Sequence, residues 1–342
     1  MGSFKKVKVE DAVGMTLAHD ITKIIPDKFK GVGFKNGHVI REEDVAELIK
    51  IGKRNIFILE VGDNELHEDA AAIRIAPAIC GRNLKWTSPK EGKSNLICET
   101  DGLLRVQADA LLSINMIGDI IVSTIKDGTP CHKGQIVAGT RIIPLMIVKE
   151  KIEALEEIGL NKGPILEISP YIKKRIGLVV TGSEIYEGLM QDESEKYVSR
   201  RVEDYGARIV KKIIVTDDPD SISNAIISLK EIDCEIILIT GGLSVDPDDV
   251  TRQGVRKAGA EIISYGSPIL PGAMFLNARL NEIPILGLPA CVYYFKRTVY
   301  DLMLPRALAG YQLTPEEIAA MGHGGLCMNC EVCHFPACPF GK

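Results

Sequence analysis

Three kinds of sequence feature are missing from this chain of 342 residues, and each absence removes a class of function. No apolar run approaches the ~20 residues that a membrane-spanning helix needs. Basic residues do not dominate, because 41 Lys and Arg stand against 46 Asp and Glu for a net charge of -5. That balance argues against a general nucleic-acid binder. Neither a Walker phosphate loop nor a Gly-x-Gly-x-x-Gly fingerprint occurs, which argues against a standard ATPase or nicotinamide dehydrogenase.

A secretion signal is also missing from the first residues, where Phe4 to Lys8 are too polar for one. We therefore expect a cytoplasmic protein. In that compartment nine cysteines do not predict a disulfide framework. Five of them are scattered and are expected to be small buried apolar residues: Cys80, Cys98, Cys131, Cys234 and Cys291. The other four crowd into the last sixteen residues.

The length predicts two or three domains. Residues 1–60 look like a small α+β unit, and residues 61–160 like a β-rich module. A helix is expected at residues 149–158, ended by Gly159, before a turn at residues 161–164. Residues 174–308 alternate strands with helices, which is typical of a parallel sheet in an α/β fold. Residues 320–342 form a cysteine-rich tail.

Two strand-to-loop junctions organise the α/β domain. The apolar run at residues 235–240 has the density of a strand buried on both faces, and Gly241 and Gly242 follow it. The strand at residues 175–180 leads in the same way into Thr181 and Gly182. In open α/β sheets, ligands bind beyond the carboxyl ends of the strands. We therefore expect the loops around Thr181, Gly241, Pro271 and Pro289 to line one crevice.

The expected crevice is polar and suited to a phosphate-bearing ligand with a divalent metal. Glycines let backbone N–H groups approach anionic oxygens, and helix N-termini add favourable dipole ends. Carboxylates attract a phosphate when Mg²⁺ lies between them. The polar side chains expected there are Glu184, Ser244, Asp246, Asp248, Asp249 and Thr251. Taken singly, each loop is explained as well by ordinary turn chemistry, with an aspartate capping the next helix.

Four motifs in order resemble the molybdopterin-binding domain of molybdopterin adenylyltransferases, molybdopterin molybdenumtransferases and competence-damage-type proteins. They are Thr181-Gly182-Ser183-Glu184, Gly241-Gly242-Leu243-Ser244 with Asp249 and Thr251, Pro271-Gly272, and Gly287-Leu288-Pro289. The resemblance implies a three-layer α/β domain that binds the dithiolene and phosphate of the pterin across the loop edge. For the molybdenumtransferase it implies Mg²⁺-assisted insertion of molybdate into adenylated molybdopterin, with loss of AMP.

The same resemblance assigns site residues. Glu184 and Asp249 match the family's acidic positions and take the catalytic or metal-holding role. The residues expected to bind the pterin are Thr181, Gly182, Ser183, Gly241, Gly242, Ser244, Thr251, Pro271, Gly272 and Pro289.

The chain departs from the transferase pattern at two motifs. Ala273 and Met274 follow Pro271-Gly272, so both lysines of the family's Lys-Pro-Gly-Lys-Pro motif are missing. Ala290 and Cys291 replace the glycine and asparagine of its Gly-Leu-Pro-Gly-Asn-Pro motif. Cys291 falls at an expected helix start, a position that favours a thiolate, although a buried inert thiol is the simpler interpretation.

The cysteine tail carries a second signal. Cys327, Cys330, Cys333 and Cys338 are spaced x2, x2 and x4, and Pro339 follows the last of them. Thiolates at such spacing bind zinc or an iron–sulfur cluster, and the ferredoxin run is shorter by one residue before its final Cys-Pro. His334 is an alternative ligand. Because His323-Gly324-Gly325 is a flexible tether, the tail is expected to fold over the crevice or dock on a partner.

Three functions remain open. The first is an enzyme of molybdenum cofactor biosynthesis. The second is a non-catalytic molybdopterin-binding carrier, sensor or maturation factor with a redox or metal-binding tail. The third is a nucleotide pyrophosphatase of the competence-damage type. The expected partners are a small pterin, a molybdoenzyme or another cofactor-synthesis protein, and further copies of this chain, with no nucleic acid or membrane.

Overall fold

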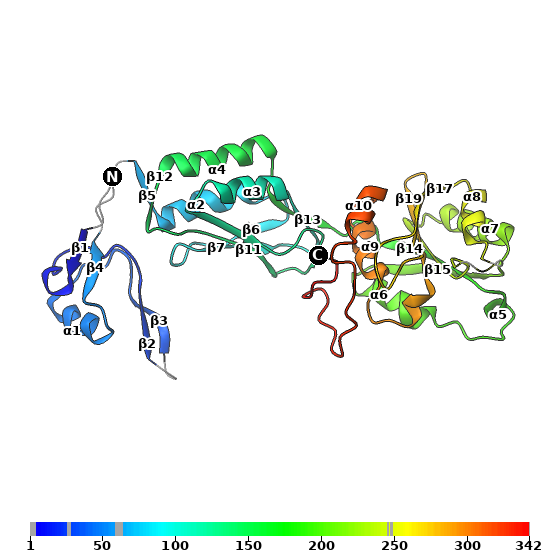
Figure 1. Cartoon of the computed structure of the whole chain (residues 1–342), viewed down its shortest axis with the longest axis horizontal. Helices are drawn as coiled ribbons and strands as arrows, with labels where there is room; N and C mark the ends of the chain where they lie inside the picture. The colour runs from blue at the N-terminus through cyan, green and yellow to red at the C-terminus, as the bar shows by residue number, and fades with distance from the viewer. Residues whose placement is uncertain (1–4, 26–28, 59–63, 245, 247–248, 342) are drawn as a thin grey trace. The chain divides into compact units, whose positions relative to one another are not determined.

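The computed structural model describes residues 5–25, 29–58, 64–244, 246 and 249–341 (Figure 1). Asp248, which the sequence places in the crevice, lies outside these residues. The chain divides into two compact units. The first contains residues 1–99, 106–125 and 133–168, and the second contains residues 100–105, 126–132 and 169–342. No helix in the described part is both long and apolar enough to cross a membrane.

The first unit begins with paired strands and a short helix around a small core. These elements are β1 (Lys5–Lys8), the 3-10 turn η1 (Val9–Asp11), β2 (Ile21–Ile25), β3 (Phe29–Phe34), α1 (Glu42–Lys50) and β4 (Asn55–Ile58). β1 pairs with β4 and β2 with β3, all antiparallel. Leu17, Leu48 and Ile56 are buried between them.

The rest of the first unit packs helices on an antiparallel sheet. Its four-stranded sheet has the order β6 (Leu84–Trp86), β7 (Ser94–Cys98), β11 (Ile136–Ile142) and β9 (Ile120–Thr124). The remaining elements are β5 (Glu65–His67), α2 (Glu68–Ile79), α3 (Ala108–Met116), β12 (Met146–Val148), α4 (Lys149–Lys162) and β13 (Leu166–Pro170), which continues past the unit's end in the sequence.

The prediction that Gly159 ends a helix is wrong, because α4 continues through it to Lys162. A Cβ atom at Gly159 would lie 2.5 Å from the Ala78 carbonyl oxygen. This glycine therefore lets α4 approach α2 closely instead of stopping the helix.

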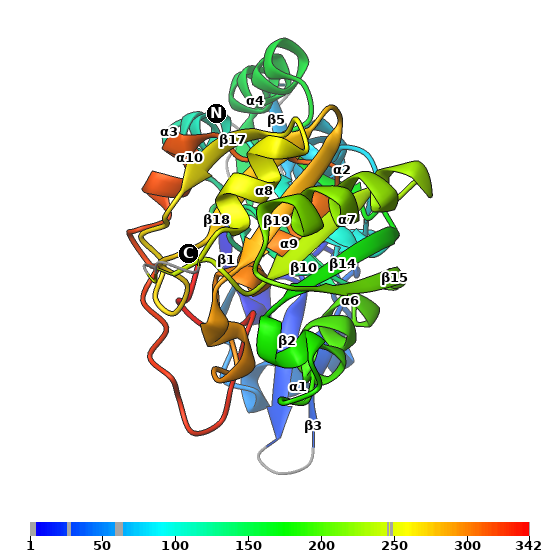
Figure 2. The same cartoon turned by 90° about the vertical axis from the view of Figure 1, so that its right-hand side faces the viewer.

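The second unit is a three-layer α/β domain built on a six-stranded, mostly parallel sheet (Figures 1 and 2). The strand order is β15 (Arg208–Val215), β14 (Arg175–Thr181), β16 (Ile236–Thr240), β19 (Ile283–Leu288), β18 (Leu276–Leu280) and β17 (Glu261–Tyr265). The first four strands are parallel, and β18 pairs antiparallel with both of its neighbours, β19 and β17. The expected fold class is confirmed. The hairpin partner β18 was not predicted as a strand.

Alternate residues of the central strands point to opposite faces of the sheet and pack in two separate cores. The sheet is therefore the middle one of three layers. Ile236 and Leu238 pack in one core with Tyr300, on α9 (Val299–Leu308). Ile237 and Ile239 pack in the other, against α7 (Pro219–Glu231) and α8 (Thr251–Lys257). The unit's other elements are β8 (Gly102–Val106), β10 (Pro130–Cys131), α5 (Ser183–Tyr186), η2 (Glu195–Ser199), α6 (Arg200–Glu203), η3 (Ala290–Tyr293) and α10 (Pro315–Ala320).

The sequence predicted one helix carrying Phe295, Val299 and Leu302 on a single face. The structure instead breaks this segment into η3 and α9. The break lies at Thr298, whose hydroxyl accepts a hydrogen bond from the Tyr300 N–H, while the Thr298 N–H donates to the Asp301 carboxylate. This capping box starts a new helix and leaves Phe295 in the loop before it.

Candidate functional site

The loop after β16 is pressed against its neighbours. Gly241 and Gly242 have φ angles of +90° and +58°, which favour glycine. A Cβ atom at Gly241 would collide with the Thr181 carbonyl oxygen and lie 2.5 Å from the Thr181 hydroxyl. The Thr251 hydroxyl donates to the Gly241 carbonyl oxygen at 2.9 Å, which fixes the start of α8 to this loop. The glycines are therefore needed for close backbone approach.

Asp249 is held at the open side of the same loop. Its carboxylate accepts a hydrogen bond from the Asp246 N–H at 3.1 Å, and the side chain is half-buried. Asp246 itself is exposed. In the same loop, the Leu243 carbonyl oxygen accepts a hydrogen bond from the Tyr265 hydroxyl. The Arg252 guanidinium stacks over the Tyr265 ring, 4.2 Å from the ring centre.

The loops at Pro271 and Pro289 form the facing wall. The register aligns Thr240 with Leu288, so the Gly241 and Pro289 loops start at the same level of the sheet. Gly272 has φ +139°, and a Cβ atom there would collide with Val299. The Val299 N–H donates to the Pro271 carbonyl oxygen at 3.0 Å, and the Ser267 hydroxyl donates to that of Gly272 at 3.0 Å.

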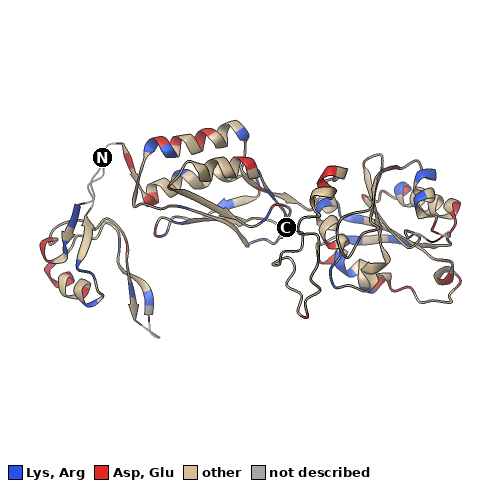
Figure 3. Ribbon diagram, in the orientation of Figure 1, with Lys and Arg blue, Asp and Glu red and all other residues tan. Residues whose placement is uncertain are grey.

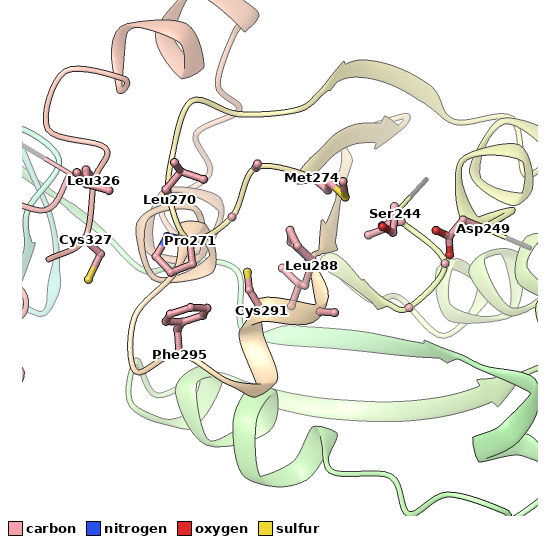
Figure 4. Close-up of a pocket in the computed structure, with 17 residues that line it drawn as sticks. Ser244, Asp249, Leu270, Pro271, Met274, Leu288, Cys291, Phe295, Leu326 and Cys327 are labelled. Carbon is pink, nitrogen blue, oxygen red and sulfur yellow. The ribbon is translucent and has the colours of Figure 1, made fainter. Parts of the chain in front are cut away.

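These loops enclose a pocket of about 620 Å³, here called the crevice (Figure 4). Ser244 and Asp249 lie at one end, and Leu326 and Cys327 at the other (Figure 4). Apolar side chains and backbone make up most of the wall between them. Its residues are Gly241, Gly242, Leu243, Ser244, Asp249, Leu270, Pro271, Gly272, Ala273, Met274, Leu288, Pro289, Ala290, Cys291, Phe295, Leu326 and Cys327. No Lys, Arg or His occurs among these described lining residues. The crevice is thus less polar than the sequence led us to expect.

The Thr181 loop, expected in the crevice, lies beside it. The Thr181 side chain is buried, and the Ser183 N–H and hydroxyl both donate to Asp217, at 2.8 and 3.1 Å. The Glu184 carboxylate folds back toward Gly182, where a Cβ atom would lie 3.1 Å from its Oε1.

The structure therefore brings together seven of the expected residues: Gly241, Gly242, Ser244, Asp249, Pro271, Gly272 and Pro289. The other five do not line the crevice: Thr181, Gly182, Ser183, Glu184 and Thr251. The roles expected of all twelve stay predictions.

The thiol of Cys291 lies in the middle of the crevice, at η3. Burial raises the pKa of this thiol, and the opposing effects of a backbone hydrogen bond and of the Arg201 charge are smaller. The neutral thiol is therefore the stable form at neutral pH, in agreement with the simpler interpretation of this residue.

Apolar residues that the sequence reasoning missed complete the crevice. Met274 lies two residues after the Pro271-Gly272 motif, and this proximity could have indicated that it lines the crevice. Phe295 was assigned to a helix face instead. Leu326 and Cys327 come from the tail, and no local pattern connects them to the sheet.

The tail folds back onto the second unit. The Leu270 N–H donates to the Gly325 carbonyl oxygen, and the Cys327 N–H donates to that of Leu270, both at 2.8 Å. Beyond this pairing the chain is an irregular coil, red in Figure 2. The expectation that the tail folds over the crevice agrees with this pairing and with the position of Cys327 in the crevice wall.

All four tail cysteines line a second, small cavity, here called the tail cavity. His334, Lys296 and Arg297 also line it, and Leu326 and Cys327 border both this cavity and the crevice. Within the described residues, no three His, Cys, Asp or Glu side chains stand close enough together to hold one metal ion.

Two family models match the chain. Residues 177–309 match the family described as "probable molybdopterin binding domain". Residues 6–60 match a domain of unknown function.

The curated relatives are similar over short stretches. A CinA-like protein of Pseudothermotoga lettingae is 35% identical over 86 residues, which is 25% of this chain and 21% of that protein. A CinA-like protein of Fervidobacterium nodosum is 35% identical over 113 residues, 32% of this chain and 25% of that protein. The chain therefore spans about a quarter or less of the length of these relatives.

Solved structures are similar at lower identity. The molybdopterin biosynthesis enzyme MoaB of Thermus thermophilus is 17% identical, with a TM-score of 0.35, over 40% of this chain and 98% of that one. A molybdenum cofactor biosynthesis protein of Pyrococcus furiosus is 15% identical, with a TM-score of 0.27, over 91% of this chain and 65% of that one.

Proposed function

We propose that residues 177–309, which form a domain of the molybdopterin-binding family, bind molybdopterin in the crevice and act in molybdenum cofactor biosynthesis. The supporting observation is the position of the crevice. It opens beyond the carboxyl ends of the parallel strands β16 and β19, and its lining residues other than Leu326 and Cys327 belong to the segment that matches the family. Ligand sites of open α/β sheets lie at this edge.

The crevice offers different contacts along its length. Its apolar wall at Leu288, Pro289 and Phe295 suits the flat pterin rings. Gly241 and Gly242 line the crevice, and backbone N–H groups of such a loop can bind a phosphate. The ligand would therefore lie with its phosphate toward Asp249.

Asp249 fits the role of magnesium ligand. Mg²⁺ is often held by one or two carboxylates together with substrate phosphates and water. Asp249 is the carboxylate among the described crevice residues, and the structure records one hydrogen bond to it, from the Asp246 N–H. Bound Mg²⁺ would neutralise charge on the pterin phosphate and the incoming oxyanion. The proposed role of Asp249 is to position the Mg²⁺ ion.

For the chemical step we infer insertion of molybdate into adenylated molybdopterin, with release of AMP. The purified chain should release AMP when given adenylated molybdopterin, molybdate and Mg²⁺. Asp249→Asn should abolish this release. Asp246→Asn, a neighbouring carboxylate outside the crevice lining, should preserve it. Equal rates in the two variants would contradict the role of Asp249.

One observation favours a second candidate, a molybdopterin carrier without catalysis. Ala273 and Met274 line the crevice where the transferase pattern has a lysine-containing motif, and no cation was found in the described lining. A carrier binds the pterin tightly without releasing AMP. Hydrolysis of ADP-ribose by the purified protein would contradict both candidates and favour a pyrophosphatase.

The proposal includes a metal in the tail and protein partners. Cys327, Cys330, Cys333 and Cys338 would hold either zinc or an iron–sulfur cluster. A molybdoenzyme or another cofactor-synthesis protein would receive the pterin, and we expect the chain to form homo-oligomers. Sedimentation of the purified chain, alone and with a candidate partner, tests both associations.

A further inference from the structure

A separate cavity of about 310 Å³ lies inside the second unit and is here called the arginine cavity. It is formed where the turn at residues 126–128 meets α9, α10 and Gly341 near the end of the tail. The described residues that line it all differ from those of the crevice and the tail cavity. Its acidic and basic residues are Arg105, Lys126, Asp127, Arg306, Glu317 and His323. Cations therefore outnumber carboxylates in this lining.

Arg306 enters the cavity from α9 and is largely buried. Its guanidinium donates to the Leu302 carbonyl oxygen at 2.6 Å, and no described carboxylate forms an ion pair with it. A Cβ atom at Gly128 would collide with this guanidinium, so the glycine, with φ +74°, leaves the space that it occupies. Burial lowers the pKa of Arg306, and the more distant charges of Asp127 and Glu317 only partly oppose that effect. A buried cation without an anionic partner is costly, so an anion bound beside it would stabilise it.

Both carboxylates of the cavity are held by other donors. Asp127 accepts a hydrogen bond from the Arg105 guanidinium at 3.2 Å, and that guanidinium also lies 4.1 Å from the centre of the Tyr311 ring. Glu317 accepts a hydrogen bond from the Thr314 N–H at 2.8 Å, at the start of α10, whose acidic residues are red in Figure 3. Neither carboxylate is therefore the counter-ion that the buried guanidinium lacks.

Two further donors line the same cavity. The Gln312 Nε2 atom is buried and has no hydrogen-bond partner, which is costly for an amide that can only donate there. Lys126 adds a cation with an exposed side chain. Since Arg105 already stacks on the Tyr311 ring, the lining favours a small anion over a ligand with a flat ring.

We propose that the arginine cavity binds a tetrahedral oxyanion, either free or as the phosphate group of a small molecule, with Arg306, Lys126 and Gln312 as its donors. A guanidinium fork matches two oxygens of such an anion, and an ammonium contributes as a point charge. The amide supplies a neutral donor. This site is separate from the crevice, so the inference goes beyond the proposed function.

The test is calorimetric titration of the full chain with inorganic phosphate, molybdate and glycerol phosphate, each in a buffer without other oxyanions. Saturable binding of phosphate or molybdate supports a site for the free anion, and binding of glycerol phosphate alone supports a site for an esterified phosphate. No binding of any of the three at millimolar concentration would overturn the proposal. The pterin is absent throughout, so the result does not depend on the proposed reaction.

Variants then place the site. Arg306→Met should weaken binding at least about tenfold, and Lys126→Met should weaken it by a smaller factor, because its side chain is exposed. Arg82→Met, which removes an exposed arginine of the first unit, should bind as the wild type does. If Arg306→Met fails to fold, Lys126→Met and Gln312→Leu still test the donors.

Thermal unfolding gives an independent measurement of the same site. The bound anion should raise the Tm of the wild type and of Arg82→Met, and should leave that of Arg306→Met unchanged. Equal affinity in the wild type, Arg306→Met and Lys126→Met would overturn the assignment. Molybdate binding that is lost in Asp249→Asn but retained in Arg306→Met would place the anion in the crevice and also overturn it.

Discussion

The crevice and the tail cavity share Leu326 and Cys327 but are built in different ways. The crevice lies on the ends of buried parallel strands, and its loops are fixed by sheet register and by glycines. The tail cavity is formed by irregular coil, held by Lys296, Arg297 and a short pairing with Leu270. We infer that the crevice is organised before its ligand binds, whereas the shape of the tail cavity depends on its anchors and on the metal proposed to bind there.

The largest predicted effect comes from breaking the buried ion cluster of Asp301 with Arg297 and Arg201. Asp301 is 3% exposed, and its carboxylate contacts Arg297 at 2.7 Å and Arg201 at 3.2 Å. Asp301→Ala leaves these cations without their buried partner and should lower the free energy of unfolding by about 3–5 kcal/mol. Urea denaturation measures this loss. In the exposed pair of Asp220 with Lys257, Asp220→Ala should cost less than about 1 kcal/mol, and equal losses would contradict the buried role of Asp301.

A smaller effect is expected from a change confined to the crevice. Gly241→Ala puts a methyl group against the Thr181 carbonyl oxygen and should destabilise the fold by about 3 kcal/mol. Gly259→Ala has a comparable φ of +83° with no atom within 4 Å of its Cβ, so it should cost about 1 kcal/mol. Denaturation of the two variants side by side separates crowding from backbone strain. If they are equally stable, the close approach at Gly241 is not needed.

Thiol reactivity sharpens the contrast between the two cavities. Cys330 and Cys333 are exposed, whereas burial raises the pKa of Cys291 and raises that of Cys80 to about 11. Since the thiolate is the nucleophile, Cys291 and Cys80 should react with iodoacetamide more slowly than the tail thiols of the metal-free protein at pH 8. The rate for Cys80 should rise further as the pH approaches its pKa of about 11. Mass spectrometry of each labelled peptide gives the rates, and fast labelling of Cys291 would contradict its burial.

The smallest effect is predicted for Glu184. Its carboxylate faces Gly182, outside the crevice lining, so Glu184→Gln should change molybdopterin affinity by less than about twofold, or 0.4 kcal/mol. Asp249→Asn should weaken the affinity in the presence of Mg²⁺ more than in its absence. Equilibrium binding with and without Mg²⁺ compares the two variants. A larger loss for Glu184→Gln would support the catalytic or metal-holding role that the family resemblance predicts for it.

The fold of the second unit could be predicted because buried parallel strands appear in the sequence as continuous apolar runs, as at residues 235–240. The antiparallel strand β18 was missed, since its polar Asn277 is buried and donates to the Leu313 carbonyl oxygen, a contact that local sequence does not reveal. Gly159 was misinterpreted for the same reason, because its close neighbour Ala78 lies in another helix.

In the candidate site, too, features set by local sequence could be predicted, whereas features set by tertiary contacts could not. Gly241 and Pro271 were found because turn chemistry is local. Glu184 was expected in the crevice because it follows a strand, but the direction of its side chain depends on tertiary contacts. The spacing of Cys327 predicts a metal ligand, whereas its place in the crevice wall depends on pairing with Leu270, which is distant in the sequence.

Occupation of the crevice by molybdopterin is tested most directly by filling it. Ala290 lines the crevice and is exposed, so Ala290→Trp should block the pterin without disturbing the core, and Ala320→Trp on α10 serves as the exposed control. We predict that wild type and Ala320→Trp bind molybdopterin equally, and that Ala290→Trp binds it at least about tenfold more weakly, a loss of about 1.4 kcal/mol. Equal affinity in all three proteins would contradict binding in the crevice.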